Sequence, residues 1–254
     1  MIRYLLLITA LITIGLTSLV SIPGSPYLIG GMTQADISAM FATAITPAGL
    51  TFSIWSVIYL GWLIAGLVLA KLPLTSLTKR YFPKSFSYLK DTFLDSRSTI
   101  TFSLAIVLTA VWLLPWGNIY IGVALIVMLA ILGLLAYVFT RTRTAHIVVR
   151  SSIEITLAWI IMASALNITV WMRYMGWSIG GPTDLYYAIG ALGTVSLIVA
   201  YLQCRYRSYI ISAVFLWTLL GVYIAHPMME RQVMVGIYAL VTTVNMIYSY
   251  ARHR

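Results

Sequence analysis

The feature of this sequence that most restricts its fold is a series of eight long apolar runs. The runs lie at residues 3–22, 49–70, 99–114, 118–140, 147–170, 185–204, 208–225 and 232–250. A helix that crosses a membrane needs about 20 predominantly apolar residues. The sequence therefore predicts an all-α protein, a polytopic bundle of about eight transmembrane helices. We expect one integral membrane domain that covers residues 1–254.

A four-residue segment, Pro115-Trp116-Gly117-Asn118, lies where the third run meets the fourth. One continuous helix over 99–140 would be about 60 Å long at 1.5 Å per residue. That length is roughly twice the hydrocarbon thickness of a bilayer. We therefore expect this segment to form the turn of a hairpin between two crossings.

The charge content agrees with a surface that faces lipid. Only 9% of the residues are charged, 61% are hydrophobic and the mean hydropathy is +0.96. Soluble domains carry about 25% charged residues, so this chain has too few charges to form a water-facing surface. The net charge of +10 does not indicate nucleic-acid binding, because the basic residues form short clusters between apolar runs.

The positions of these basic residues predict the orientation of the chain, because cytoplasmic loops are rich in Lys and Arg. With a cytoplasmic N-terminus, 14 of the 16 basic residues lie on the cytoplasmic side. They are Arg3, Lys71, Lys79, Arg80, Lys84, Lys90, Arg97, Arg141, Arg143, Arg150, Arg205, Arg207, Arg252 and Arg254. Only Arg173 and Arg231 lie outside. Both termini are therefore expected in the cytoplasm, and the protein in the cell membrane (the cytoplasmic membrane of a bacterium).

Cleavage of the first run as a signal peptide is the alternative, and it would leave seven helices and an external N-terminus. The run is long for such a peptide, and no small-residue cleavage site precedes Ile22-Pro23-Gly24. We therefore keep it as the first transmembrane helix.

Two loops are long enough to have structure of their own. In the outer loop 23–48, Thr33-Gln34-Ala35-Asp36 resembles a capping box. Apolar residues then recur at helical spacing, which predicts a short amphipathic helix on the membrane surface. These residues are Ile37, Met40, Phe41, Ala44 and Ile45. The basic, aromatic inner loop 72–98 is expected to lie on the anionic cytoplasmic leaflet, with docking of a partner protein as the alternative.

The sequence holds no recognisable catalytic motif. His146, His226 and His253 lie at helix ends or in the tail, without the spacing of metal ligands. The single cysteine, Cys204, excludes an internal disulfide and a multi-cysteine metal site. P-loop, GxGxxG, GxSxG and HExxH motifs are absent. We therefore expect a protein that is not an enzyme and has no metal site.

One acidic residue, Glu154, lies about two turns inside the fifth run, where a carboxylate is costly. Arg150 is four residues before it, on the same face of a helix. One interpretation is a structural ion pair whose arginine reaches toward the interface. The other is a ligand or proton site.

An aromatic stripe begins the second run. It follows Pro47 and Gly49, which end the preceding loop. Its members recur at spacings of 3, 4 and 3, so they share one face of a helix. They are Phe52, Trp55, Tyr59 and Trp62. The stripe runs too deep to be an interfacial belt, so it either packs against a neighbouring helix or lines an aromatic cavity.

The stretch from Thr46 to Trp62 resembles the proline-then-aromatic signature of the TspO/MBR family, the tryptophan-rich sensory proteins related to the translocator protein. Leu157 to Asn167 is similar to a Leu-Gly-Trp…Asn segment of longer members, and Phe215 to Gly221 is similar to their penultimate helix. The resemblance covers about half of the chain. Thr46-Pro47-Ala48 stands where the family has Trp-Pro-Pro, and the short members have five helices rather than eight.

The resemblance implies a pocket for a flat apolar molecule such as a porphyrin or a sterol, with a sensory, regulatory or transport role. The residues implied to line or shape this pocket are Pro47, Phe52, Trp55, Tyr59, Trp159 and Asn167. A tetrapyrrole would be one such ligand, oriented by the polar groups of Asn167 or Glu154. A secondary transporter of small solutes is a second hypothesis, although the two halves of the chain show no repeat. A homo-oligomer or a subunit of a larger membrane complex is a third.

Overall fold

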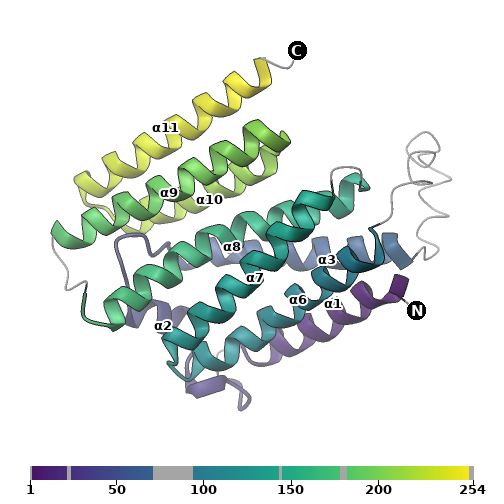
Figure 1. The fold of residues 1–254 in the computed structure, drawn as a ribbon. Helices are drawn as coiled ribbons and strands as arrows, with labels where there is room; N and C mark the ends of the chain where they lie inside the picture. The colour runs from purple at the N-terminus through teal and green to yellow at the C-terminus, as the bar shows by residue number, and fades with distance from the viewer. Residues whose placement is uncertain (1, 22–23, 71–93, 143–144, 178–181, 252–254) are drawn as a thin grey trace.

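The computed structural model describes residues 2–21, 24–70, 94–142, 145–177 and 182–251, and this part of the chain is helical without strands (Figure 1). The helices are α1 (Ile2–Leu19), α2 (Gln34–Met40), α3 (Ile54–Ala70), α6 (Ser96–Gly117), α7 (Ile121–Arg141), α8 (Ile147–Tyr174), α9 (Pro182–Tyr206), α10 (Tyr209–Ala225) and α11 (Met229–Ala251). Two 3-10 turns, η1 (Ile29–Gly31) and η2 (Gly49–Ser53), lie in the outer loop and before α3.

Each predicted apolar run is a helix in the structure. Seven helical segments in the described ranges are long and apolar enough to cross a membrane, and the apolar helix Tyr209–Ala225 is shorter, at 17 residues. Even 17 residues lie within the range for a crossing. The predicted fold class, a polytopic bundle of membrane helices, is confirmed, and the protein is an integral membrane protein.

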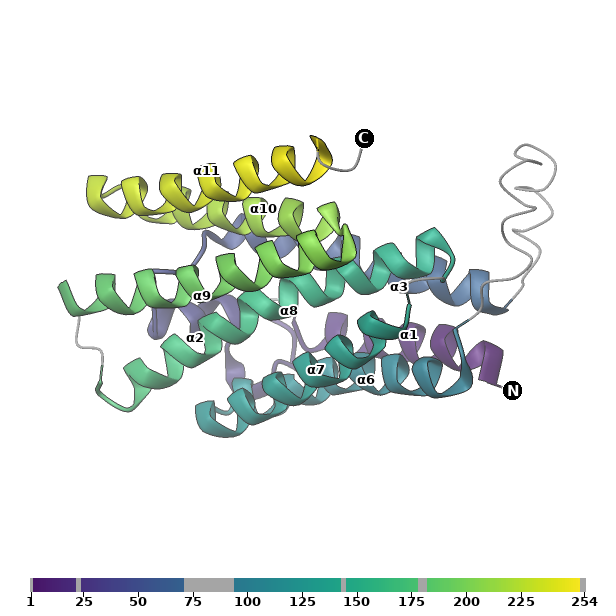
Figure 2. The same cartoon turned by 45° about the horizontal axis from the view of Figure 1, so that its top comes forward.

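The centre of the bundle is α8. In its apolar 18-residue stretch 83% of the residues are buried, whereas in the corresponding stretches of α1 and α11 only 22% are buried. On one side of α8 lie α1, α3, α6 and α7, and on the other side lie α9, α10 and α11 (Figures 1 and 2). The fold is therefore a five-helix group extended by three further helices, with α8 in contact with both parts.

The start of α1 and the end of α11 lie toward the end of the bundle that is opposite α2 (Figures 1 and 2). An even number of crossings has this consequence, so the geometry agrees with eight transmembrane helices. The assignment of that end to the cytoplasm stays a prediction from the charge distribution.

Cysteine labelling tests this orientation. In a Cys204→Ser background, Tyr27→Cys and Met229→Cys should react with an impermeant maleimide from the external side of sealed membranes, because both positions are exposed in the structure. Ser96→Cys, which is exposed at the other end, should react only after permeabilisation. Reaction of Ser96→Cys in sealed membranes would refute the predicted orientation.

The turn between α6 and α7 differs from the prediction. The third run was expected to end at residue 114, but α6 continues through Pro115 to Gly117. Proline lacks an N–H and disrupts a helix interior, yet here it lies in the last turn, where Asn118 N–H still donates to the Leu114 carbonyl at 3.2 Å. The chain reverses one step later, at Asn118 to Tyr120, with Ile119 at φ 61°.

A helix is present in the outer loop, as predicted, and it is shorter than expected, while its place on the membrane surface stays a prediction. Thr33 caps α2 in a capping box, since Asp36 N–H donates to Thr33 Oγ1 at 3.2 Å and Thr33 N–H donates to Asp36 Oδ2 at 2.8 Å. The helix ends at Met40, and Ala44 and Ile45 are buried beyond it. Loop 72–98 is expected to contact the cytoplasmic leaflet, but most of this loop lies within 71–93, which is outside the described residues.

Candidate ligand-binding site

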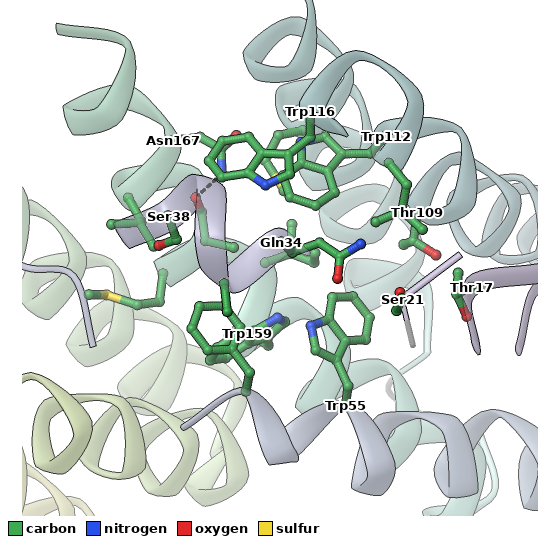
Figure 3. A pocket seen from close by; sticks show the side chains of 18 of the residues that line it. Thr17, Ser21, Gln34, Ser38, Trp55, Thr109, Trp112, Trp116, Trp159 and Asn167 are labelled. Atoms are coloured by element: carbon green, nitrogen blue, oxygen red, sulfur yellow. Dashed lines mark hydrogen bonds between the residues drawn. The ribbon is translucent and has the colours of Figure 1, made fainter. Parts of the chain in front are cut away.

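A cavity of about 550 Å³ lies inside the five-helix group. Its walls come from α1, α3, α6, α7 and α8, with Thr218 of α10 beside them, and α2 covers it at one end (Figure 3). The lining is mostly apolar and aromatic. It includes Thr17, Gln34, Ser38, Pro47, Phe52, Trp55, Tyr59, Thr109, Trp112, Trp116, Met128, Ile131, Trp159, Ala163, Asn167 and Thr218. All six residues of the predicted pocket therefore lie around one cavity, and their part in binding a ligand stays a prediction.

One wall of the cavity is aromatic and comes from the predicted stripe. The ring centroid of Trp159, on α8, lies 5.7 Å from that of Phe52 and 6.3 Å from that of Trp55, both in edge-to-face contact. Tyr59 follows one turn later, with its centroid 5.5 Å from that of Trp55. These rings support one another at their edges, which is a favourable aromatic geometry, and they leave part of their surface to the cavity.

The last member of the stripe has a different environment. Trp62 is completely buried, its indole N–H donates to Thr156 Oγ1 at 3.0 Å, and it does not line the cavity. The two interpretations of the stripe therefore divide along its length. Phe52, Trp55 and Tyr59 line the cavity, whereas Trp62 packs between α3 and α8.

The opposite wall was not predicted from the sequence. Trp112 and Trp116 of α6 stack on each other with centroids 4.9 Å apart, and Figure 3 shows them across the cavity from Trp55 and Trp159. Their spacing of four residues was a signal for a shared helix face. It was missed because Pro115-Trp116 was assigned to a turn.

The amide of Asn167 is buried on the cavity side of α8. Its Nδ2 donates to the Ala163 carbonyl at 2.9 Å, and its Oδ1 has no hydrogen-bond partner among the described residues. The sequence suggested that an amide in this position needs a partner. In the structure the amide nitrogen has a partner in its own helix, whereas the amide oxygen has no partner among the described residues.

The segment that carries Pro47 and Phe52 is held by α10. Ala48 N–H donates to the Gly221 carbonyl at 3.0 Å, and the Trp217 indole donates to the Thr51 carbonyl at 3.1 Å. A third contact joins the same elements, because the side chain of Thr51 packs directly against Gly221. The Phe215–Gly221 stretch therefore positions one wall of the cavity from outside the five-helix group.

The ion pair predicted inside α8 is present. Arg150 Nε lies 2.7 Å from Glu154 Oε1, and Arg150 Nη2 also donates to the Tyr206 carbonyl at the end of α9, at 2.8 Å. Glu154 is buried and is not part of the cavity lining. This geometry favours the structural interpretation, in which the pair connects α8 to α9, and the role of Asn167 in orienting a ligand stays a prediction.

A substitution tests the structural role of this pair. Glu154→Gln should lower the free energy of unfolding by about 1–3 kcal/mol, because it leaves the arginine without its charged partner. The double variant with Arg150→Gln should recover part of the loss. Thermal denaturation in detergent measures both. If Glu154→Gln keeps full stability and loses ligand binding, the pair is a functional site instead.

At the end of the bundle where α2 lies, His226 connects the loop before α11 to the segment that carries Pro47 and Phe52. Its Nε2 lies 3.0 Å from the Thr46 carbonyl, so Nε2 carries the proton, and Nδ1 accepts from Arg231 Nη1 at 2.9 Å. Burial lowers the pKa of His226 below its ordinary 6.5, and the Arg231 charge lowers it further, while the hydrogen bond to Thr46 opposes both. The neutral imidazole is therefore the form that fits this site.

The depressed pKa predicts a pH dependence of stability. The folded state holds the His226 proton less tightly than the unfolded state does. The contribution of the neutral His226 side chain to the free energy of unfolding is therefore complete above pH 6.5, and it is lost as the pH falls through the pKa of the folded state. Melting curves of the wild-type protein and His226→Gln at pH 8 and pH 5 test it. The difference between the two proteins should shrink at pH 5, and an unchanged difference would refute it.

Comparisons with known proteins agree with this architecture. A model of the TSPO-like protein family matches residues 3–250. No curated protein and no solved structure matches the chain. The family match extends beyond the aromatic stretch that suggested the resemblance, and it includes α9, α10 and most of α11. The chain is an integral membrane protein that belongs to the TSPO-like protein family.

Proposed function

We propose that this protein binds a flat, predominantly apolar small molecule, of porphyrin or sterol type, in the cavity between α3, α6 and α8, and that binding serves sensing, regulation or transport. The observation that carries the proposal is the pair of facing indole walls, Trp112 and Trp116 opposite Trp55 and Trp159 (Figure 3).

The size and lining of the cavity suit such a ligand. Pockets for small molecules have volumes of about 300–1,000 Å³ and are lined by apolar and aromatic residues with a few polar groups. The volume here is about 550 Å³. Met128, Ile131 and Leu166 add aliphatic surface between the aromatic walls, so a ligand would gain from burial of its apolar area as well as from stacking.

A binding function, rather than a catalytic one, fits the groups in this lining. Its polar side chains are hydroxyls, amides and indoles. Such groups orient a bound molecule by hydrogen bonds, whereas proton transfer in catalysis generally uses a His, a carboxylate or a Lys. We therefore propose that the lining recognises a ligand without changing it covalently.

Titration of the purified protein tests the proposal. Protoporphyrin and cholesterol are added to protein in detergent, and tryptophan quenching and tetrapyrrole absorbance are followed. At least one of the two should bind saturably at one molecule per chain. Ala163→Phe, which fills the cavity from α8, should abolish the signal, and Ile168→Phe, on the exposed face of the same helix, should not. No saturable binding of either probe, or equal binding by both variants, would refute the proposal.

A further inference from the structure

Four buried polar atoms that belong to the cavity lining have no hydrogen-bond partner among the described residues. They are Trp112 Nε1, Trp116 Nε1, Asn167 Oδ1 and Ser38 Oγ. Buried polar groups in proteins are almost always paired, and an unpaired one is destabilising. Five further unpaired buried atoms lie elsewhere in the described ranges, but these four belong to residues that line one cavity, where a bound group could pair with them.

Three other hydroxyls of the lining provide a contrast. Thr17, Thr109 and Thr218 each donate to a carbonyl of their own helix, at 3.1, 2.6 and 2.8 Å. Their hydrogen-bonding needs are met without a ligand. Within the cavity lining, the unpaired buried atoms lie on α2, at the end of α6 and in the Asn167 turn of α8.

The chemistry of the four atoms specifies what they would recognise. An indole Nε1–H only donates, an amide Oδ1 only accepts, and a hydroxyl does both. A ligand group that satisfies them must accept hydrogen bonds from Trp112 and Trp116 and donate one to Asn167. A hydroxyl or an unsubstituted amide meets both conditions, whereas an ester or an ether only accepts.

The lining also restricts the charge of that group. Among the described residues, those that line the cavity include no Lys, Arg, His, Asp or Glu. An ionised group buried without an opposite charge is strongly disfavoured. A carboxylate or a sulfate would find indole donors here but no cation, so the site selects against anions.

We infer that the cavity selects an uncharged ligand whose polar end both accepts and donates hydrogen bonds, a hydroxyl or an amide held by Trp112, Trp116 and Asn167, while its apolar body lies between the aromatic walls. This inference rests on the proposed function and narrows its ligand class, since it disfavours a tetrapyrrole that carries free carboxylates.

Two series of probes separate the polar end from the body. The tetrapyrrole series is protoporphyrin as the diamide, the dimethyl ester and the free dicarboxylic acid. The sterol series is cholesterol, its methyl ether and its sulfate. In whichever series binds, we expect the donor-bearing neutral form to bind most tightly, and the form that only accepts to bind about 5- to 10-fold more weakly, the scale of one lost hydrogen bond. The anionic form should be the weakest.

Conservative variants assign the preference to named atoms. Asn167→Leu removes the acceptor and keeps the side-chain volume, so it should abolish the preference for the amide or hydroxyl over the ester or ether. Trp112→Phe and Trp116→Phe remove the donors and keep an aromatic ring, so they should weaken both neutral forms by about 5-fold each. Trp177→Phe, at an exposed site outside the cavity lining, is the matched control and should change nothing.

The outcomes distinguish the inference from the proposed function. If neither scaffold binds in any form, the proposed function is wrong and the inference with it. If a scaffold binds and the anion equals or exceeds the neutral donor, or Asn167→Leu keeps the full preference, the inference is wrong and the proposed function stands. A neutral preference that disappears in Asn167→Leu supports both.

Discussion

Replacing Gly221 with leucine should displace the wall of the cavity that carries Pro47 and Phe52, and lower the free energy of unfolding by about 3 kcal/mol or more. A Cβ atom at this position would overlap Thr51 Oγ1 and lie 2.9 Å from Thr51 Cβ and Cγ2. Thr51 cannot move away, because it is buried and its carbonyl accepts from Trp217. Overpacking of a filled site typically costs about 1–3 kcal/mol, and leucine adds four heavy atoms where the first already clashes.

The matched control is Gly236→Leu on α11, where an added Cβ meets nothing within 4 Å. Thermal denaturation in detergent should show a large loss for Gly221→Leu and little change for Gly236→Leu. The Gly221 variant should also bind the flat probe more weakly. Retention of wild-type stability and affinity would show that α10 does not position this wall.

Replacing Trp55 with alanine should weaken binding of the flat ligand by about 1–3 kcal/mol, the scale of one lost aromatic stacking partner. Part of the Trp55 indole faces the cavity, where protein atoms do not cover it. Truncation of a fully packed tryptophan costs about 3–5 kcal/mol of stability. For Trp55 we expect a smaller loss of stability, because fewer protein contacts are removed.

Trp62 is the control for this experiment, on the same helix and seven residues later. Its ring is completely buried and its N–H bonds to Thr156, so Trp62→Ala should cause the larger loss of stability. Thermal denaturation and ligand titration of the two variants give, for each, the loss of binding free energy divided by the loss of free energy of unfolding. A higher ratio for Trp62 than for Trp55 would contradict the assignment of Trp55 to the cavity.

Much of the fold was predictable because lipid imposes a simple rule on sequence. Backbone polar groups have no water to bond in a bilayer, so a long apolar run must be a helix. The helix ends were less predictable, as Pro115 shows. A proline in the last helical turn and a proline in a connecting turn look alike in sequence, and the choice depends on how α6 packs against η1 and α7.

The candidate site was predictable on one wall. Phe52, Trp55 and Tyr59 share a helical face by spacing alone, and the family resemblance added Trp159 and Asn167. The wall formed by Trp112 and Trp116 was missed with the hairpin turn. Ser38 was missed because no local pattern tells which surface a seven-residue loop helix will cover.

What the sequence by itself determined is therefore local. Helical periodicity placed Arg150 beside Glu154 at four residues' distance, placed Thr33 as the cap of α2, and aligned the aromatic stripe. Tertiary structure decided which side of each helix faces empty space. Tyr59 and Trp62 belong to one stripe, yet the first lines a cavity and the second is packed, because Thr156 of α8 meets Trp62. Periodicity assigns residues to a face, but only the neighbouring helices determine whether that face is filled.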